Sequence, residues 1–149
     1  MDTYVEREEI EVLRVRADMK GAGPAEAFRL LESKLASLRG RHFYGTIRIL
    51  PEGEEYFACV QRQEGEEPER MDLELGRIPG GLYVRRKITD WESIIAAGRL
   101  PSIGREMAET YTVDPSRPEI EYYRSRKELH LLVPVLVRAP LEAGTSSRP

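Results

Sequence analysis

Apolar residues follow two periodicities along this chain, and each periodicity predicts a different kind of element. Strict alternation with polar residues places one side of an extended chain against a core and predicts a strand. Apolar residues spaced three and four apart line one side of a helix. Alternation predicts strands over residues 8–18, 43–50, 55–63, 82–88, 119–123 and 128–137, with a further short strand over 71–75.

Helical spacing occurs in two segments. The first begins at Pro24, a residue suited to the first turn of a helix, and ends at Gly40. The second begins near Thr89, which forms a candidate capping box with Glu92. Because proline cannot continue a helix, Pro101 predicts that this second segment is broken into two pieces.

The main elements occur in the order strand, helix, strand, strand, and this order then repeats. The repeat predicts an α+β fold of duplicated units, with a curved, largely antiparallel sheet and two main helices on one face. A chain of 149 residues can bury a core without cross-links, so we predict a single domain over residues 1–137. Residues 138–149 lack periodicity and apolar content, which predicts a disordered tail.

One turn delivers a tyrosine directly onto a predicted strand, in the run Ile78-Pro79-Gly80-Gly81-Leu82-Tyr83. Adjacent glycines let a second chain segment or a ligand approach the backbone closely. Alternation places Tyr83 on the face opposite Leu82, Val84 and Ile88, which form the predicted core face. Tyr83 therefore either lines a ligand pocket or packs against a neighbouring strand.

A second signal is the strand Pro118-Glu119-Ile120-Glu121-Tyr122-Tyr123, which precedes the strand containing His130. Glu121 and Tyr123 share one face and could reach a ligand, or the glutamates could form a solvated row that pairs with basic residues across the sheet. His130 shares a face with Glu128. It could contact a ligand, or it could bond to backbone or to a tyrosine hydroxyl.

These signals together resemble the GyrI-like small-molecule-binding domain, the effector-binding module of bacterial drug-responsive transcription regulators, in its stand-alone form. In element order the resemblance covers roughly residues 5–137. It implies a ligand cleft between the two halves of the sheet, lined by Tyr83, Glu121 and Tyr123. His130 stands where the family usually carries a carboxylate that attracts lipophilic cations.

Three further aromatic residues are candidates for the ligand-binding cleft: Tyr56, Trp91 and Tyr111. Trp91 is the only tryptophan and opens the second helical segment, where packing in the core is the alternative role. The spacing of the two tyrosines leaves both roles open.

Charge and composition exclude several classes of protein. The formal net charge of −3 provides no basic footprint for nucleic acid, so we expect no direct DNA binding. No apolar run reaches the length needed to span a bilayer, and the single Cys59 cannot form an internal disulfide, so we expect a cytoplasmic protein without membrane contact. Two histidines and one cysteine lack metal-ligand spacing, so no metal or other cofactor is expected.

The first functional hypothesis is therefore binding of small hydrophobic or aromatic molecules in a tyrosine-lined cleft, for sensing or sequestration rather than catalysis. The resemblance also implies two alternatives. One is a hydrolase that opens strained, electrophilic rings such as cyclopropanes, with Glu121 as general base. The other is a protein-interaction module whose partner is a regulator or DNA gyrase.

Overall fold

The computed structural model describes residues 1–139, and this part of the chain forms an α+β fold of eight strands and four helices. The strands are β1 (Asp2–Arg7), β2 (Ile10–Arg16), β3 (Phe43–Leu50), β4 (Gly53–Gln61), β5 (Glu74–Ile78), β6 (Gly81–Thr89), β7 (Glu119–Tyr123) and β8 (Glu128–Pro134). The helices are α1 (Gly23–Ser33), α2 (Pro68–Met71), α3 (Trp91–Ala96) and α4 (Leu100–Thr110). None of these helices is long and apolar enough to cross a membrane.

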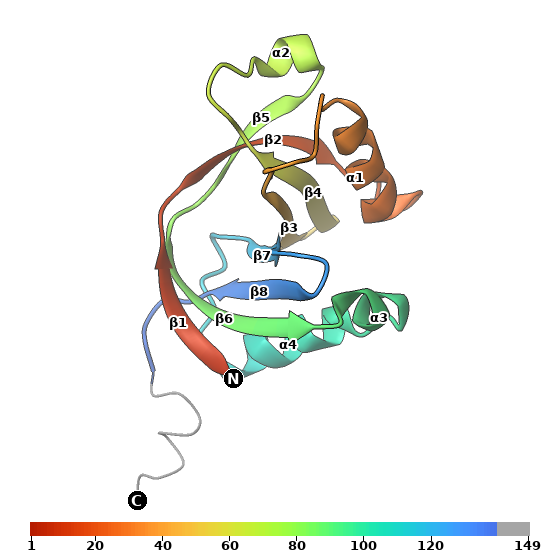
Figure 1. Cartoon of the computed structure of the whole chain (residues 1–149). Coiled ribbons are helices and arrows are strands. Elements are labelled where there is room, and N and C mark those ends of the chain that lie inside the picture. The colour runs from red at the N-terminus through yellow and green to blue at the C-terminus, as the bar shows by residue number, and fades with distance from the viewer. Residues whose placement is uncertain (140–149) are drawn as a thin grey trace, which may run out of the picture.

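All eight strands of the described chain belong to one antiparallel sheet, in the order β1-β6-β8-β7-β3-β4-β2-β5. In the first half β4 lies between β2 and β3, and in the second half β8 lies between β6 and β7. The two halves therefore repeat the same pairing, and they meet where β3 pairs with β7. Helix α1 covers the first half, and α3 and α4 cover the second, all on one face of the curved sheet (Figure 1). This confirms the predicted duplicated α+β architecture.

The strands at the two ends of the sheet form a single bent ribbon across its helix-free face (Figure 1). One register runs through both pairings, since Asp2 lies opposite Arg86 in β1–β6 and Arg14 lies opposite Glu74 in β2–β5. At the bend, a Cβ atom on Gly80 would lie 2.8 Å from the Arg7 carbonyl oxygen. The close approach expected at the two glycines is therefore made by a second segment of the chain.

The bent ribbon encloses a hydrophobic core on the helix-free face, and Tyr83 lies in it. The Tyr83 side chain is fully buried, and its hydroxyl donates to the Pro79 carbonyl oxygen at 2.5 Å. The Arg117 guanidinium lies 4.8 Å from the centre of its ring. Its neighbours in this core include Val12, Tyr44, Phe57, Cys59, Ile78, Ile120 and Leu132. Tyr83 is therefore a core residue, as the packing interpretation predicted.

A second core lies on the helix side of the sheet, in two parts. Leu31 of α1 packs on Leu13, Ala58 and Val60, and Met107 of α4 packs on residues of β6 and β8. Val84 and Ile88 lie in this second part, as their alternation predicts. Both faces of the sheet thus carry a core, whereas alternation alone suggested one.

Several element boundaries differ from the sequence-based predictions. The edge strand β1 was not predicted, since Asp2, Glu6 and Arg7 weaken its apolar pattern and its pairing with β6 supplies the order. Helix α1 ends at Ser33, well before Gly40. A short strand was predicted over 71–75, but residue 71 is the end of helix α2, and β5 begins only at Glu74.

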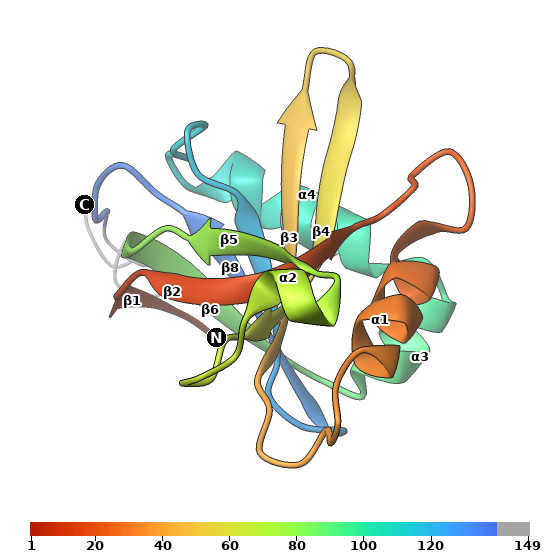
Figure 2. The same cartoon turned by 90° about the horizontal axis from the view of Figure 1, so that it is seen from above.

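The second helical segment is broken as predicted, with Pro101 in the first turn of α4. The capping box predicted from Thr89 and Glu92 is wrong, because the residue before α3 is Asp90 in a left-handed conformation and no side chain caps that helix. The break leaves α3 and α4 as separate helices that both border the space beside α1 (Figure 2).

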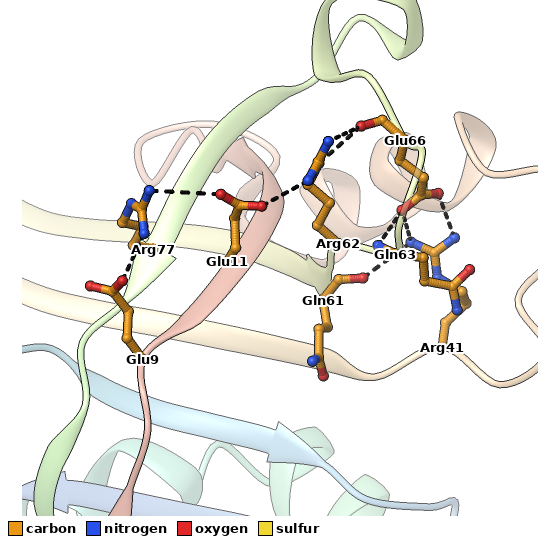
Figure 3. Close-up of polar contacts among 8 residues, drawn as sticks. All are labelled: Glu9, Glu11, Arg41, Gln61, Arg62, Gln63, Glu66 and Arg77. Carbon is orange, nitrogen blue, oxygen red and sulfur yellow. Dashed lines mark hydrogen bonds and ion pairs between the residues drawn. The ribbon is translucent and has the colours of Figure 1, made fainter.

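A chain of ion pairs ties the β2–β5 edge to the segment after β4, with one link made by hydrogen bonds from Arg62 to the backbone carbonyl oxygen of Glu66 (Figure 3). It consists of Glu9, Arg77, Glu11, Arg62, Glu66 and Arg41. Arg41 holds Glu66 through two hydrogen bonds of 2.8 and 2.9 Å. Burial acts to raise the pKa of Glu66, but these bonds and the charges of Arg41 and Arg62 lower it. Glu66 is therefore ionised, and its ion pair with Arg41 fixes the loop.

The first residues of the predicted tail contact the body of the protein. The Ala139 amide donates to the Tyr4 hydroxyl at 2.8 Å, and the Arg138 guanidinium lies 5.5 Å from the centre of the same ring. The rest of the predicted tail, residues 140–149, lies outside the described residues.

The burial of Tyr83 makes a prediction about stability. Tyr83→Ala should lower the free energy of unfolding by about 3–5 kcal/mol, because it leaves a cavity the size of an aromatic ring. Tyr83→Phe removes only the bond to Pro79 and should cost about 1 kcal/mol. Urea denaturation of both variants measures the difference, and a Tyr83→Ala protein as stable as the parent would contradict the core assignment.

Candidate functional site

A cavity of about 890 Å³ lies on the helix face, between α1 on one side and α3 with α4 on the other. Its floor is the sheet where the two halves meet. The residues that line it are Met19, Pro24, Ala25, Phe28, Glu32, Phe43, Ile47, Ile49, Glu54, Tyr56, Trp91, Ile95, Gly98, Leu100, Pro101, Gly104, Arg105, Ala108, Glu119, Glu121, Tyr123 and Leu131. Most of these side chains are apolar or aromatic, as is typical of small-molecule sites.

Glu121 on β7 lies at the floor of this cavity and is only 5% exposed. Its Oε1 atom accepts hydrogen bonds from the Tyr56 hydroxyl at 2.5 Å and from the Tyr123 hydroxyl at 2.7 Å. The strand beside it provides the space for this cluster, since Gly45 lies directly opposite Glu121. A Cβ atom on Gly45 would lie 2.1 Å from the Tyr56 hydroxyl oxygen, so only glycine fits there.

The environment of Glu121 favours its protonated form. Burial raises its pKa, and the two tyrosine hydroxyls only partly oppose that effect. Burial also raises the pKa of Tyr123, and the neighbouring Glu121 charge adds to the shift. The tyrosines therefore stay protonated and donate to Glu121.

Aromatic rings from four elements form the walls around the carboxylate. Phe28 of α1 meets the Tyr123 ring edge to face, with centres 5.4 Å apart, and lies 6.3 Å from the Tyr56 ring. Trp91 of α3 meets Tyr123 at 5.2 Å, and its indole nitrogen donates to the Ser125 carbonyl oxygen at 2.8 Å. Four aromatic rings therefore surround Glu121, and each is fixed in orientation by a neighbour.

A second carboxylate, Glu119, lies two residues before Glu121 on the same face of β7 and also lines the cavity. Burial raises its pKa, and the negative charges of Glu121 and Glu54 raise it further. Helix α4 makes room for it at Gly104, where a Cβ atom would lie 2.9 Å from Glu119 Oε1. Each of the two carboxylates thus faces a glycine of a neighbouring element.

The chemistry available in the cavity comes from these carboxylates and tyrosines. Within the described residues no group of three His, Cys, Asp or Glu side chains could hold a metal ion. A carboxylate surrounded by aromatic rings attracts a cation, and a carboxyl with a raised pKa can also exchange a proton with water or substrate. The site can therefore bind a cationic apolar ligand or act as a general acid or base.

The structure brings together four of the seven residues proposed for the ligand site from the sequence. Tyr56, Trp91, Glu121 and Tyr123 all line the helix-face cavity. Trp91 also packs on the protein, so its two proposed roles are combined.

The other three residues lie elsewhere. Tyr83 and His130 are on the helix-free face, because the pairing of β6, β8 and β7 alternates them with the residues that face the helices. The expectation that Tyr83, Glu121 and His130 share one cleft is wrong. His130 Nε2 lies 2.5 Å from a Glu128 carboxylate oxygen, and its ring meets Tyr122 edge to face at 5.6 Å.

Tyr111 follows α4 and packs beside the second core, where its hydroxyl donates to Asp2 at 2.7 Å. It does not line the cavity in the described structure. Because Asp2 belongs to β1, an element that the sequence pattern missed, this contact had no signal in the sequence.

Sequence reasoning missed four residues that shape the site: Phe28, Gly45, Gly104 and Glu119. Alternation places Glu119 on the face of Glu121, but the sequence offers only a solvated row as its role. Phe28 follows the helical periodicity of α1 and has the pattern of any core residue. The two glycines show their role only when the carboxylates opposite them are known.

Comparison with known proteins identifies the fold and no family. No protein-family model matches the sequence, and no curated protein matches it. Among solved structures, an integron cassette protein from the mobile metagenome of Vibrio cholerae has a TM-score of 0.64 at 15% identity, over 91% of this chain and 95% of that one.

Two further solved structures share the architecture. A hydrolase from Listeria innocua has a TM-score of 0.58 at 14% identity, over 91% of each chain. A putative bacterial transcription regulation protein from Staphylococcus aureus MU50 has a TM-score of 0.56 at 8% identity, over 92% of this chain and 99% of that one. At such identities the likeness establishes the fold alone, and function must be argued from the cavity.

The raised pKa of Glu121 predicts a pH-dependent difference between the parent protein and Glu121→Gln. The unfolded parent ionises Glu121 near the ordinary carboxyl pKa, whereas the folded parent holds the proton to higher pH. The stability that Glu121 contributes is therefore lost as pH rises through its folded pKa. The variant, which has no charge to bury, should gain stability relative to the parent as pH rises above the ordinary carboxyl range.

Thermal denaturation of the two proteins across this range, without ligand, measures the drift. A stability difference that stays constant, or that moves in favour of the parent as pH rises, would show that Glu121 is not held in a desolvated site.

Proposed function

We propose that this protein binds small, largely apolar or aromatic molecules in the helix-face cavity and prefers those that carry a positive charge near Glu121. The observation that carries the proposal is a carboxylate that is almost fully buried in an apolar cavity, with two tyrosine donors and no cationic partner among residues 1–139. An unpaired buried carboxylate is costly, and a cationic ligand would supply the missing charge.

The rim of the cavity supports an apolar ligand. Ile49, on the β3–β4 hairpin that projects beyond the body of the protein in Figure 2, is 72% exposed and lines the cavity. Ile95 of α3 and Met19 also line it and are partly exposed. Apolar side chains grouped at the mouth of a cavity are typical of a binding surface.

A hydrolase is the second candidate function, and the state of Glu121 favours it specifically. A general base needs a pKa above that of an ordinary carboxylate and a site from which bulk water is excluded. Glu121 has both properties. In the reaction, Glu121 would take a proton from water as the water oxygen attacks a strained ring carbon, and it would return that proton to the ring carbon released by cleavage of the carbon–carbon bond. A role as partner of gyrase or of a regulator stays a prediction.

Binding can be tested with a matched pair of ligands, benzyltrimethylammonium and its neutral carbon isostere neopentylbenzene. We expect the cation to bind more tightly, and we expect Glu121→Gln to weaken it by about 1–3 kcal/mol while the neutral compound changes little. The affinity for the cation should rise with pH as Glu121 ionises. Fluorescence of Trp91, the only tryptophan, reports both titrations from within the cavity.

Glu109→Gln is the matched control, since it removes a carboxylate from the exposed side of α4. If the two variants weaken the cation equally, the effect is one of overall charge, and the proposed role of Glu121 fails.

The hydrolase alternative predicts a product with the added mass of one water molecule. Incubation with an electrophilic cyclopropane compound should give a ring-opened hydrate detectable by mass spectrometry, and Glu121→Gln should abolish the excess over buffer. If the parent protein binds the compound but hydrates it no faster than buffer does, the hydrolase alternative is wrong and the binding function remains.

A further inference from the structure

The cavity contains more carboxyl groups than one cationic group can pair with. Four glutamates line it, namely Glu32, Glu54, Glu119 and Glu121, and the only cationic lining residue among the described residues is Arg105. Of the four, Glu119 and Glu121 lie at the floor, on one strand and one face. The other two are exposed at the rim.

Neither floor carboxylate has a cationic partner within residues 1–139. Glu121 is 95% buried and receives only tyrosine hydroxyls. Glu119 is half-buried, and the charges that act on it, those of Glu121 and Glu54, are both negative. A ligand with one positive group would neutralise Glu121 and leave Glu119 unpaired beside it.

The geometry points to a specificity that rests on the proposed function: we infer that the cavity prefers amphipathic diamines, in which an aromatic group occupies the apolar wall and two ammonium groups reach Glu121 and Glu119. Residues two apart on a strand have Cα atoms about 6–7 Å apart. Four methylene groups between two nitrogens span a similar distance. The aromatic rings around Glu121 would hold the first ammonium and its aryl substituent.

Helix α4 provides independent support for a positioned second carboxylate. Gly104 is buried against β7 and β8, and a side chain there would meet Glu119 Oε1 at 2.9 Å and Leu131 Cδ2 at 3.8 Å. Glycine inside a helix weakens it relative to alanine, so its use here needs a local reason. The reason found in the structure is space for the Glu119 carboxylate. Glu119 is thus a specificity-determining residue of the site.

The test compares N-benzyl-1,4-diaminobutane with N-benzylpentylamine, which differ only in an ammonium group replaced by a methyl group. For the parent protein we expect at least a tenfold tighter dissociation constant for the diamine, measured by calorimetry at low ionic strength and near-neutral pH. Glu119→Gln should reduce the ratio of the two dissociation constants to near one, while the monoamine keeps its affinity. The control variant Glu109→Gln should keep the ratio of the parent protein. Gly104→Ala should reduce the ratio as well, because it displaces Glu119 without removing its charge.

The outcomes separate the two proposals. If the monoamine binds and depends on Glu121, but the diamine has no advantage or keeps its advantage in Glu119→Gln, the diamine specificity is overturned and the binding function stands. If neither amine binds the parent protein, both are overturned. If Glu109→Gln lowers the ratio as much as Glu119→Gln, the preference comes from the overall negative charge, and the assignment to Glu119 is overturned.

Discussion

The bent antiparallel ribbon formed by β1–β2 and β5–β6 is the constraint on which the rest of this structure depends. One continuous register holds it from Asp2–Arg86 to Arg14–Glu74, and the absence of a side chain at Gly80 lets the two segments approach each other closely at the bend. By wrapping the helix-free face, the ribbon fills that side of the sheet with a core around Tyr83. The opposite side is covered by separate helices, which leave a cavity between them.

The cavity retains a carboxylate that an apolar environment disfavours. Transfer of an ionised carboxylate out of water is costly unless hydrogen bonds or an opposite charge replace the solvent. At Glu121, two tyrosine hydroxyls replace part of the lost solvent, but no opposite charge among the described residues compensates the carboxylate. Such incomplete compensation is the expected state of a binding site in its free form, since part of the stabilisation must come from the ligand.

The helices and strands could be predicted from the sequence better than the face of the sheet that carries the cavity. Alternation located β3 and β7 to the residue and separated Tyr83 from Val84 correctly, because strand periodicity depends only on neighbouring residues. Whether the second face is solvent, cleft or core depends on what covers it. The cover is the bent ribbon, which includes β1, an edge strand with a weak apolar pattern. For the same reason Glu121 was found and its partner Gly45 was not, since cross-strand register is a long-range property.

The duplication of the fold within a single chain has a consequence for symmetry. Two identical units meeting through β3 and β7 would supply every residue at that junction twice, so a glutamate on one side would return as a second glutamate on the other. Here the first half contributes Gly45 and Tyr56, and the second contributes Glu121 and Tyr123. Because the two halves belong to one chain, one half can hold a charge carried by the other, and a substitution in one half does not impose the same substitution on the other.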